Sequence, residues 1–131
     1  MAVNDAPVLG IVWSMDMEYP KFGTIIIDGT SYDHDVVVDA GVVRKRKKGP
    51  SKQFRSEYGH TPLSAGEDIP WSKPQLVIGT GFSGRLPVML ELRHRAEHNG
   101  VELVTLPTAE ACALLRTLDA SDVNAVLHVT C

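Results

Sequence analysis

The second half of the sequence alternates between strand-like and helix-like segments, which strongly limits the folds open to the chain. The three strand-like segments are apolar and cover residues 76–78, 101–106 and 123–129. Two helix-like segments lie between them, residues 89–98 and a stretch capped by Thr108. Crossovers of this length join parallel strands, so we predict a βαβαβ unit over residues 76–131. In sequential strand order, right-handed crossovers place both helices on one face of the sheet.

The first third of the sequence predicts a different kind of pairing. Two β-rich runs, residues 22–27 and 32–38, are separated by Asp28-Gly29, a dipeptide typical of tight hairpin turns. A further short strand at residues 42–43 follows another turn. Because these connections are too short for crossovers, the strands they join are predicted to be antiparallel.

An additional strand is expected over residues 8–15, with Trp13 as an apolar anchor. The antiparallel region, residues 8–43, is the only candidate to cover the sheet face opposite the helices. The predicted fold is therefore a layered α/β domain. Its parallel C-terminal half carries helices on one face, and an N-terminal antiparallel β-layer covers the other.

Residues 44–75 have another character, because Gly, Pro, Ser and charged residues dominate and no apolar period persists. Ser64 and Glu67 have the spacing of a capping box, but Pro70 stops any helix there after about one turn. We interpret this stretch as an irregular, basic connection between the two halves. The 131 residues then form a single domain.

Positive charge is concentrated in that connection, although the chain has a net charge of −3. Seven of its 13 Lys and Arg residues fall within residues 44–55, namely Arg44, Lys45, Arg46, Lys47, Lys48, Lys52 and Arg55. The other six stand against 16 Asp and Glu residues. Such segregation indicates either an interaction surface or a basic loop neutralised by its own acidic body. The acidic remainder and a pI of about 5.9 argue against a nucleic-acid partner.

A glycine-rich loop, residues 79–84, directly follows the first apolar run of the parallel unit. Glycines permit close backbone approach, and amide groups at a helix start favour an anion. A dinucleotide site also needs a carboxylate after the second strand, and Leu106-Pro107-Thr108 provides none. A simple strand-to-helix turn and an anion loop both remain open. The candidate ligand residues are Gly79, Thr80, Gly81, Ser83, Gly84, Arg85, Thr108 and Cys131.

The end of the sequence bears on that loop. Cys131 lies two residues beyond the third expected strand, so we expect its carboxylate at the same sheet edge. A carboxylate within about 4 Å of a bound phosphate opposes it by roughly 1–4 kcal/mol. Anion binding then requires Arg85 or the basic segment to fold over the loop. Alternatively, the chain's own carboxylate occupies the loop.

Catalytic motifs are incomplete in the sequence. Ser83 does not stand in a nucleophile elbow, because Gly84 comes one residue too early. In the Asp33-His34-Asp35 run, both acids face the side of a strand opposite to His34, so no local acid–base pair forms. A partner from another strand remains open. The sequence therefore predicts no catalytic residue.

Metal and cofactor sites are also not indicated. His128 and Cys131 are three residues apart, but no other ligands with metal-site spacing accompany them. His60 lies in the irregular connection and can reach a pocket, without a visible partner. We therefore expect neither a metal nor a cofactor.

Targeting features point to the cytoplasm. No apolar run reaches the roughly 18 residues of a spanning helix. The first residues lack the basic-then-apolar order of a secretory signal, and two cysteines are too few for a disulfide framework. We expect a cytoplasmic protein without a membrane partner, as a monomer or weak homodimer.

Several segments together resemble one small family. They are Phe22-Gly23-x-Ile25-x-Ile27-Asp28-Gly29, Tyr32-x-His34-Asp35-Val36, the Lys/Arg run, Ile78-Gly79-Thr80-Gly81 and Val126-Leu127-His128-Val129-Thr130-Cys131. The family is the uncharacterised domain shared by bacterial and archaeal proteins, an adipogenesis-associated animal protein and, more distantly, a mitochondrial respiratory-complex assembly factor. The resemblance implies a compact α/β domain with an added β-layer, no established activity, no known cofactor and a role in protein association. Residues 64–74 depart from it, because Pro70 and Pro74 stand where relatives often have a helix.

Our leading prediction from the sequence is a non-catalytic, cytoplasmic interaction or assembly module with a protein partner. Its predicted surface combines the basic segment with the edge of the glycine loop. The rival prediction is a small-molecule or anion-binding protein, or an enzyme, that uses residues 79–84. Nucleic-acid binding ranks third.

Overall fold

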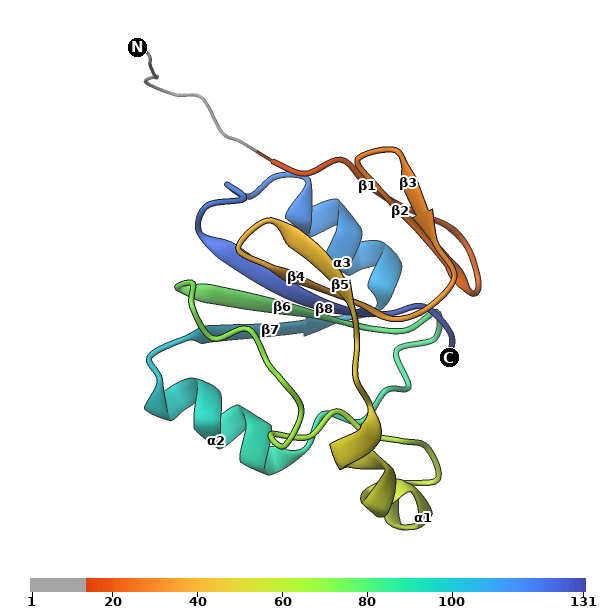
Figure 1. The fold of residues 1–131 in the computed structure, drawn as a ribbon, viewed down its shortest axis with the longest axis vertical. Coiled ribbons are helices and arrows are strands. Elements are labelled where there is room, and N and C mark those ends of the chain that lie inside the picture. Colours follow the sequence, from red (N-terminus) through yellow and green to blue (C-terminus); the bar gives the residue numbers. More distant parts are fainter. Residues whose placement is uncertain (1–13) are drawn as a thin grey trace.

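The computed structural model describes residues 14–131, which form two β-sheets and flanking helices (Figure 1). The three-stranded antiparallel sheet contains, in order, β1 (Met17–Lys21), β2 (Thr24–Ile27) and β3 (Thr30–Tyr32). The five-stranded sheet contains β4 (Val36–Asp39), β5 (Val42–Lys45), β6 (Gln75–Thr80), β7 (Glu102–Leu106) and β8 (Val123–His128). The helical segments are η1 (Gly49–Phe54), α1 (Arg55–Tyr58), α2 (Leu90–His98) and α3 (Thr108–Leu115).

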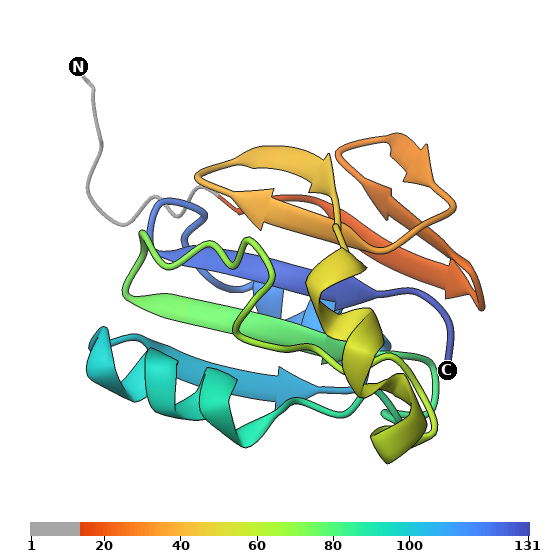
Figure 2. The same cartoon turned by 60° about the horizontal axis from the view of Figure 1, so that its bottom comes forward.

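The predicted α/β class is confirmed, including the parallel unit and the N-terminal antiparallel sheet. β6 pairs in parallel with both β7 and β8. The strand order β5-β4-β8-β6-β7 is not sequential, however, because β8 returns past β6 to pair with β4. A right-handed crossover in that reverse direction places its helix on the other face. Accordingly α2 and α3 lie on opposite sides of the sheet (Figure 2).

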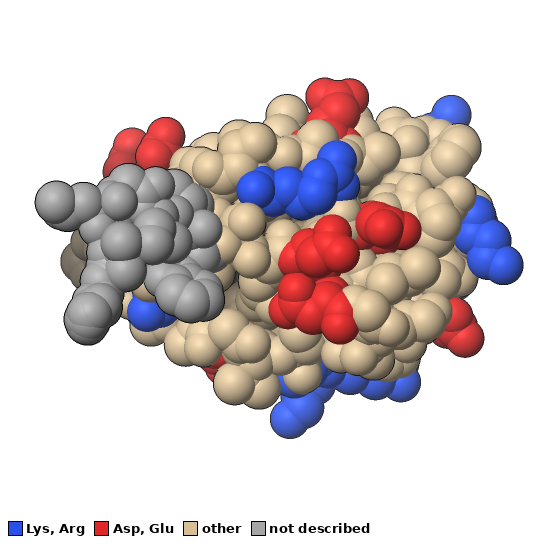
Figure 3. Space-filling model, turned by 90° about the horizontal axis from the view of Figure 1, so that it is seen from above, with Lys and Arg blue, Asp and Glu red and all other residues tan. Residues whose placement is uncertain are grey.

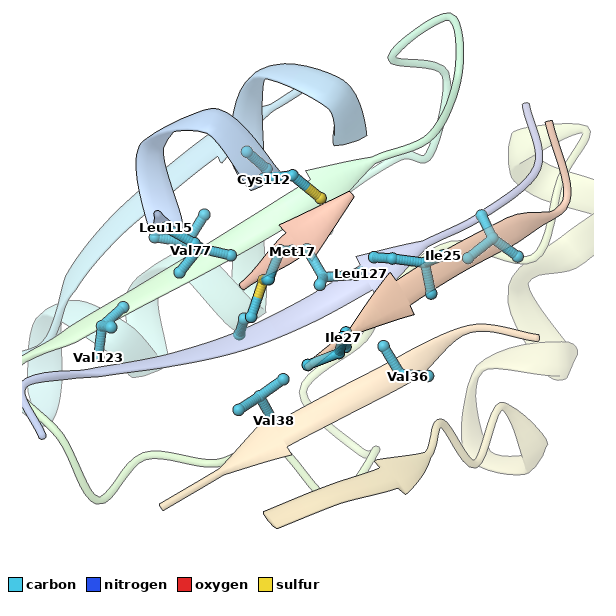
Figure 4. Close-up of a cluster of buried hydrophobic side chains, with 13 residues drawn as sticks. Met17, Ile25, Ile27, Val36, Val38, Val77, Cys112, Leu115, Val123 and Leu127 are labelled. Carbon is cyan, nitrogen blue, oxygen red and sulfur yellow. The ribbon is translucent and has the colours of Figure 1, made fainter. Parts of the chain in front are cut away.

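The first hydrophobic core lies between the five-stranded sheet on one side and α3 and the three-stranded sheet on the other (Figure 4). Met17 and Ile25 of the small sheet pack there with Cys112 of α3 and with Val77 and Leu127 of the large sheet. The β-layer therefore shares its face with α3. This differs from the sequence prediction of helices on one face and the β-layer on the other.

The second core covers the opposite face. Leu76, Ile78 and Val126 pack against Leu92 of α2 and against Leu63 of the 44–75 connection. Neighbouring residues of β6 thus enter different cores, as expected for a strand buried on both faces. The connection that the sequence describes as irregular is therefore part of the packed structure.

The predicted Asp28-Gly29 hairpin is confirmed, with Ile27 paired to Thr30. Both turn residues have positive φ, 49° and 84°, which suits the right-handed twist of the flanking strands. The run over residues 32–38 is not one strand: β3 ends at Tyr32 and β4 starts at Val36 in the other sheet. Of the expected strand at residues 8–15, residues 8–13 lie outside the described part of the chain.

Two short helical segments, η1 and α1, form within the basic connection. Pro50 stands in the first turn of η1, where its missing amide hydrogen costs nothing. No helix forms over residues 64–74, in agreement with Pro70 and Pro74. None of the helices within residues 14–131 combines the length and apolar character needed to cross a membrane.

Candidate anion-binding site

A pocket of about 320 Å³ opens at the carboxyl ends of β6 and β8, the edge where open α/β sheets bind ligands. It is lined by four cationic side chains and two histidines: Lys48, Lys52, Arg55, Arg85, His60 and His128. We call it the cationic pocket. Among the described residues that line it there is no Asp or Glu. A second pocket, of about 440 Å³, shares Lys48, Lys52 and Thr130 with it, so the two adjoin.

The wall between the sheet and the basic connection is built on a buried arginine. The Arg46 side chain is only 1% exposed and donates from Nη1 to Asp35 Oδ2 at 2.9 Å. Its Nε and Nη2 donate to the two carboxylate oxygens of Glu67 at 2.8 and 2.7 Å. A further bond reaches Pro62 O at 2.9 Å. One arginine therefore joins the residue that precedes β4 to the loop that follows α1.

Two serines extend this network to η1. The Ser51 hydroxyl donates to Glu67 Oε2, and the Ser64 amide donates to Ser51 Oγ at 3.2 Å. Ser51 lies in η1, between the two pocket lysines Lys48 and Lys52. The buried network therefore fixes the segment from which the pocket's positive charge projects.

Asp35 connects the network to β8. Its Oδ2 lies 2.8 Å from His128 Nδ1, and its Oδ1 accepts a hydrogen bond from the Val129 amide at 2.9 Å. Burial alone raises the pKa of Asp35, but the hydrogen bond and charge of His128, the Val129 amide and Arg46 together lower that pKa to about 2. The Arg46 pKa is raised above its ordinary value, since its bonds to Glu67 and Asp35 outweigh burial. Both groups are therefore charged at neutral pH.

This pKa shift predicts an acid-sensitive fold. The Asp35 pKa is about 2 in the folded chain and about 3.8 in its ordinary state. A depressed carboxyl pKa contributes stability above pH ~4, and that contribution disappears as the pH falls from ~4 towards ~2. A shift of this size corresponds to roughly 2–3 kcal/mol. Urea unfolding at a series of pH values should show this loss, and Asp35→Asn should flatten it. An equally steep pH dependence in that variant would assign the loss to other carboxylates.

The glycine loop is occupied by the chain itself. The Phe82 amide donates to Thr130 O at 2.7 Å, and the Ser83 and Arg85 amides donate to Cys131 O at 3.1 and 3.2 Å. The backbone oxygens of the last two residues therefore take the amides that the sequence offers to an external anion. This agrees with the alternative that the chain's own end fills the loop. Of the predicted loop residues, Arg85 and Cys131 line the cationic pocket.

Thr108 has a role other than the predicted helix cap. Pro107 holds the cap position of α3, and Thr108 is the first helical residue, so that prediction is wrong. Its buried hydroxyl accepts from the Gly81 amide at 2.8 Å and donates to His128 O at 2.6 Å. Thr108 thereby ties the glycine loop, α3 and β8 together.

The seven cations of the basic segment do not form one surface. Arg46 is buried, and Arg44 contacts Asp39 and Asp68 at 3.7 and 3.5 Å, as expected for a segment neutralised by its own acidic body. Lys48, Lys52 and Arg55 line the cationic pocket, whereas Lys45 lines only the adjoining one. On the face seen in Figure 3, Lys and Arg side chains lie beside Asp and Glu side chains rather than in a continuous basic patch.

Asp35 pairs with His128, a partner that the sequence does not indicate. The two residues are 93 positions apart, but β4 and β8 pair with Val36 opposite Leu127, which brings their flanking residues together. His34 instead turns its Nδ1 to the Asp35 carbonyl oxygen at 3.0 Å. His60 reaches the cationic pocket, as the sequence allowed. Within residues 14–131, no three His, Cys, Asp or Glu side chains are grouped to hold a metal ion.

Solved structures show the family of this chain. The conserved hypothetical protein PH1505 from Pyrococcus horikoshii OT3 is 31% identical, with a TM-score of 0.72, and the match covers 89% of this chain and 100% of that one. The chain belongs to the same family as PH1505. The protein MT938 is 28% identical with a TM-score of 0.64, over 90% of this chain and 100% of that one.

A third solved structure shares the fold, at a sequence identity too low to show membership of the same family. An outer membrane protein from Bartonella henselae is 18% identical with a TM-score of 0.59, over 90% of this chain and 97% of that one. No family model matches the chain, and no curated protein matches it. Since PH1505 is described only as a conserved hypothetical protein, family membership assigns the fold and leaves the function open.

Proposed function

We propose that the protein binds a small anionic ligand, bearing a phosphate or carboxylate group, in the cationic pocket. The observation that carries this proposal is the pocket's charge. Four cationic side chains and two histidines line it, with no Asp or Glu among the described lining residues, and these cations outnumber the carboxylate expected at Cys131. Cations converging on a concave site attract anions, and arginines can bind phosphate or carboxylate through two hydrogen bonds.

The nearest buried acid does not cancel this charge. Asp35 Oδ2 lies 2.9 Å from Arg46 Nη1 and 2.8 Å from His128 Nδ1, but 4.0 Å from Lys48 Nζ. Arg46, which Asp35 shares with Glu67, and the hydrogen bond to His128 therefore compensate part of the carboxylate charge, and Lys48 lies farther from it than either partner. The side chain of Lys48 is 44% exposed, which leaves it accessible to a ligand.

The proposed ligand is held by the side chains beside the glycine loop and not by the loop's amides. The amides of Phe82, Ser83 and Arg85 already have partners, so they support the pocket rather than the anion. The Arg85 side chain is the part of the loop that contributes charge to the site.

Calorimetric titration with inorganic pyrophosphate tests this function. We expect the Lys52→Glu/Arg55→Glu double variant to bind at least 10-fold more weakly, about 1.4 kcal/mol, and binding by the parent to weaken with salt. A charge-matched control is Lys21→Glu/Lys47→Glu, since neither residue lines a described pocket. Equal weakening in the control, or no binding by the parent, would contradict the proposal.

Protein association is the second candidate, and it is the function implied by the resemblance to the adipogenesis-associated protein and the assembly factor. Phe22 and Phe82 favour it: they are 54% and 61% exposed, with ring centroids 6.0 Å apart. A second copy of the chain is the simplest partner, because a two-fold contact lets the same rings cover each other. Light scattering at increasing protein concentration measures such an association, because the average molecular mass should rise towards that of a dimer.

A further inference from the structure

We propose that the cationic pocket is a hydrolytic active site in which Asp35, His128 and Thr130 act as a triad, with the Thr130 hydroxyl as nucleophile. The substrate class is a small ester whose acyl or alcohol part carries a phosphate or carboxylate group. The inference rests on the proposed anion-binding function, and adds a reaction to it.

The geometry of the three side chains supports the triad. Asp35 Oδ2 and His128 Nδ1 are 2.8 Å apart, and His128 Nε2 is 3.3 Å from Thr130 Oγ1. An ionised carboxylate only accepts hydrogen bonds, so in the neutral form of His128 the proton is on Nδ1 and the Nε2 lone pair faces the hydroxyl. A nucleophile, a base and a group that orients the base therefore lie within reach of one another, with the Nε2 to Oγ1 distance of 3.3 Å at the long end for such a contact.

Burial and anchoring suit a fixed base. The side chains of Asp35 and His128 are only 3% and 12% exposed. Arg46 and the Val129 amide hold the carboxylate, and the Phe82 amide holds the Thr130 carbonyl oxygen. None of these bonds uses Nε2 of His128, which stays available for proton transfer.

The position of Thr130 connects the triad to the bound anion. Thr130 lines both adjoining pockets, and His128 lines the cationic one. Lys52, Arg55 and Arg85 can therefore hold the anionic end of a substrate while its ester group lies near the hydroxyl.

The proposed reaction is balanced with water as the only co-reactant. Thr130 Oγ1 attacks the ester carbonyl carbon, and its proton moves to His128 Nε2. The bond from that carbon to the leaving oxygen breaks, and His128 gives the proton to the departing alcohol. Water then attacks the acyl carbon and transfers a proton to His128. Cleavage of the bond to Oγ1 releases the acid, and the proton returns to Thr130.

A fluorophosphonate probe tests the nucleophile directly. We expect one covalent adduct by intact-mass spectrometry, located on Thr130 by peptide mapping and absent from Thr130→Val. The control is Thr117→Val, whose exposed hydroxyl donates to Leu114 O away from the pockets and whose removal should leave labelling unchanged. His128→Asn should react at least 10-fold more slowly. An adduct on Cys131, or labelling that persists in Thr130→Val, would overturn the proposal.

Turnover provides a second readout. We expect 4-nitrophenyl hemisuccinate to be hydrolysed with at least 10-fold higher kcat/KM than the neutral 4-nitrophenyl acetate. Lys52→Glu/Arg55→Glu should remove that preference. If the parent binds pyrophosphate but neither reacts with the probe nor hydrolyses these esters faster than Thr130→Val, the triad is refuted while anion binding stands. If pyrophosphate does not bind either, both proposals fail.

Discussion

Replacing Arg46 with methionine should lower the free energy of unfolding by about 3–5 kcal/mol, the range for removing one partner of a buried ion pair. The substitution removes the cation shared by Asp35 and Glu67, whose side chains are each 3% exposed. Asp35 would then keep only His128 and Lys48, whose Nζ is 4.0 Å away, and Glu67 would lose its buried positive partner. Domains of this size are stable by about 5–15 kcal/mol, so much of the folding free energy is at risk. Urea unfolding of the variant measures the loss.

Arg44→Met is the matched control, because it makes the same chemical change two residues away on β5. The Arg44 side chain is 25% exposed, and its carboxylate contacts are 3.5 and 3.7 Å long. Exposed pairs of this kind contribute about 0–1 kcal/mol. If the two variants unfold at similar urea concentrations, the buried arginine does not hold the connection to the sheet.

The second large effect is expected at Gly81. An added Cβ would lie 2.5 Å from Thr130 O and 2.8 Å from Cys131 O, and closer still to the Cys131 carbonyl carbon. Gly81 also has a φ of 103°, which side chains rarely adopt. Steric overlap with backbone costs about 1–3 kcal/mol and the unfavourable φ about 1–2 kcal/mol, so Gly81→Ala should destabilise the fold by about 2–5 kcal/mol. Chemical denaturation measures this.

Gly59→Ala separates the two contributions. Gly59 has a φ of 76°, but a Cβ there meets nothing within 4 Å. It should therefore cost only the backbone term of about 1–2 kcal/mol. Hydrogen exchange gives an independent check, because displacing residues 130–131 should expose the Phe82 and Ser83 amides in Gly81→Ala alone. Unchanged protection there would mean that the loop accommodates the methyl group without releasing the chain.

The sequence predicts the local elements of this fold well, because they depend on short-range chemistry. Asp28-Gly29 produces a hairpin through its turn preference, and the apolar runs of β6, β7 and β8 produce parallel strands joined by helices. The strand order could not be predicted in this way. An apolar strand such as β8 can lie either at the edge of the sheet or between β4 and β6, and its own residues do not show which. The face of the sheet on which α3 lies depends on that order, so it could not be predicted either.

Part of the candidate site could also be predicted from the sequence. The glycine loop and the basic run are continuous in sequence, so both are recognised, although the structure gives them other roles than the predicted ones. Asp35 and His128 become partners only through the antiparallel pairing of β4 with β8. The burial of Arg46 likewise depends on Glu67, 21 residues away in a loop. A run made only of Lys and Arg gives no sign of which cation turns inward.

The central place of β8 also makes the protein sensitive to premature termination of synthesis. A polypeptide stopped before residue 123 would have all the other strands of the large sheet, but β4 and β6 would lack the segment that joins them. Each half would expose an unpaired strand edge, and such edges recruit other chains. Truncated products are therefore expected to aggregate or be degraded rather than to persist as partly folded monomers.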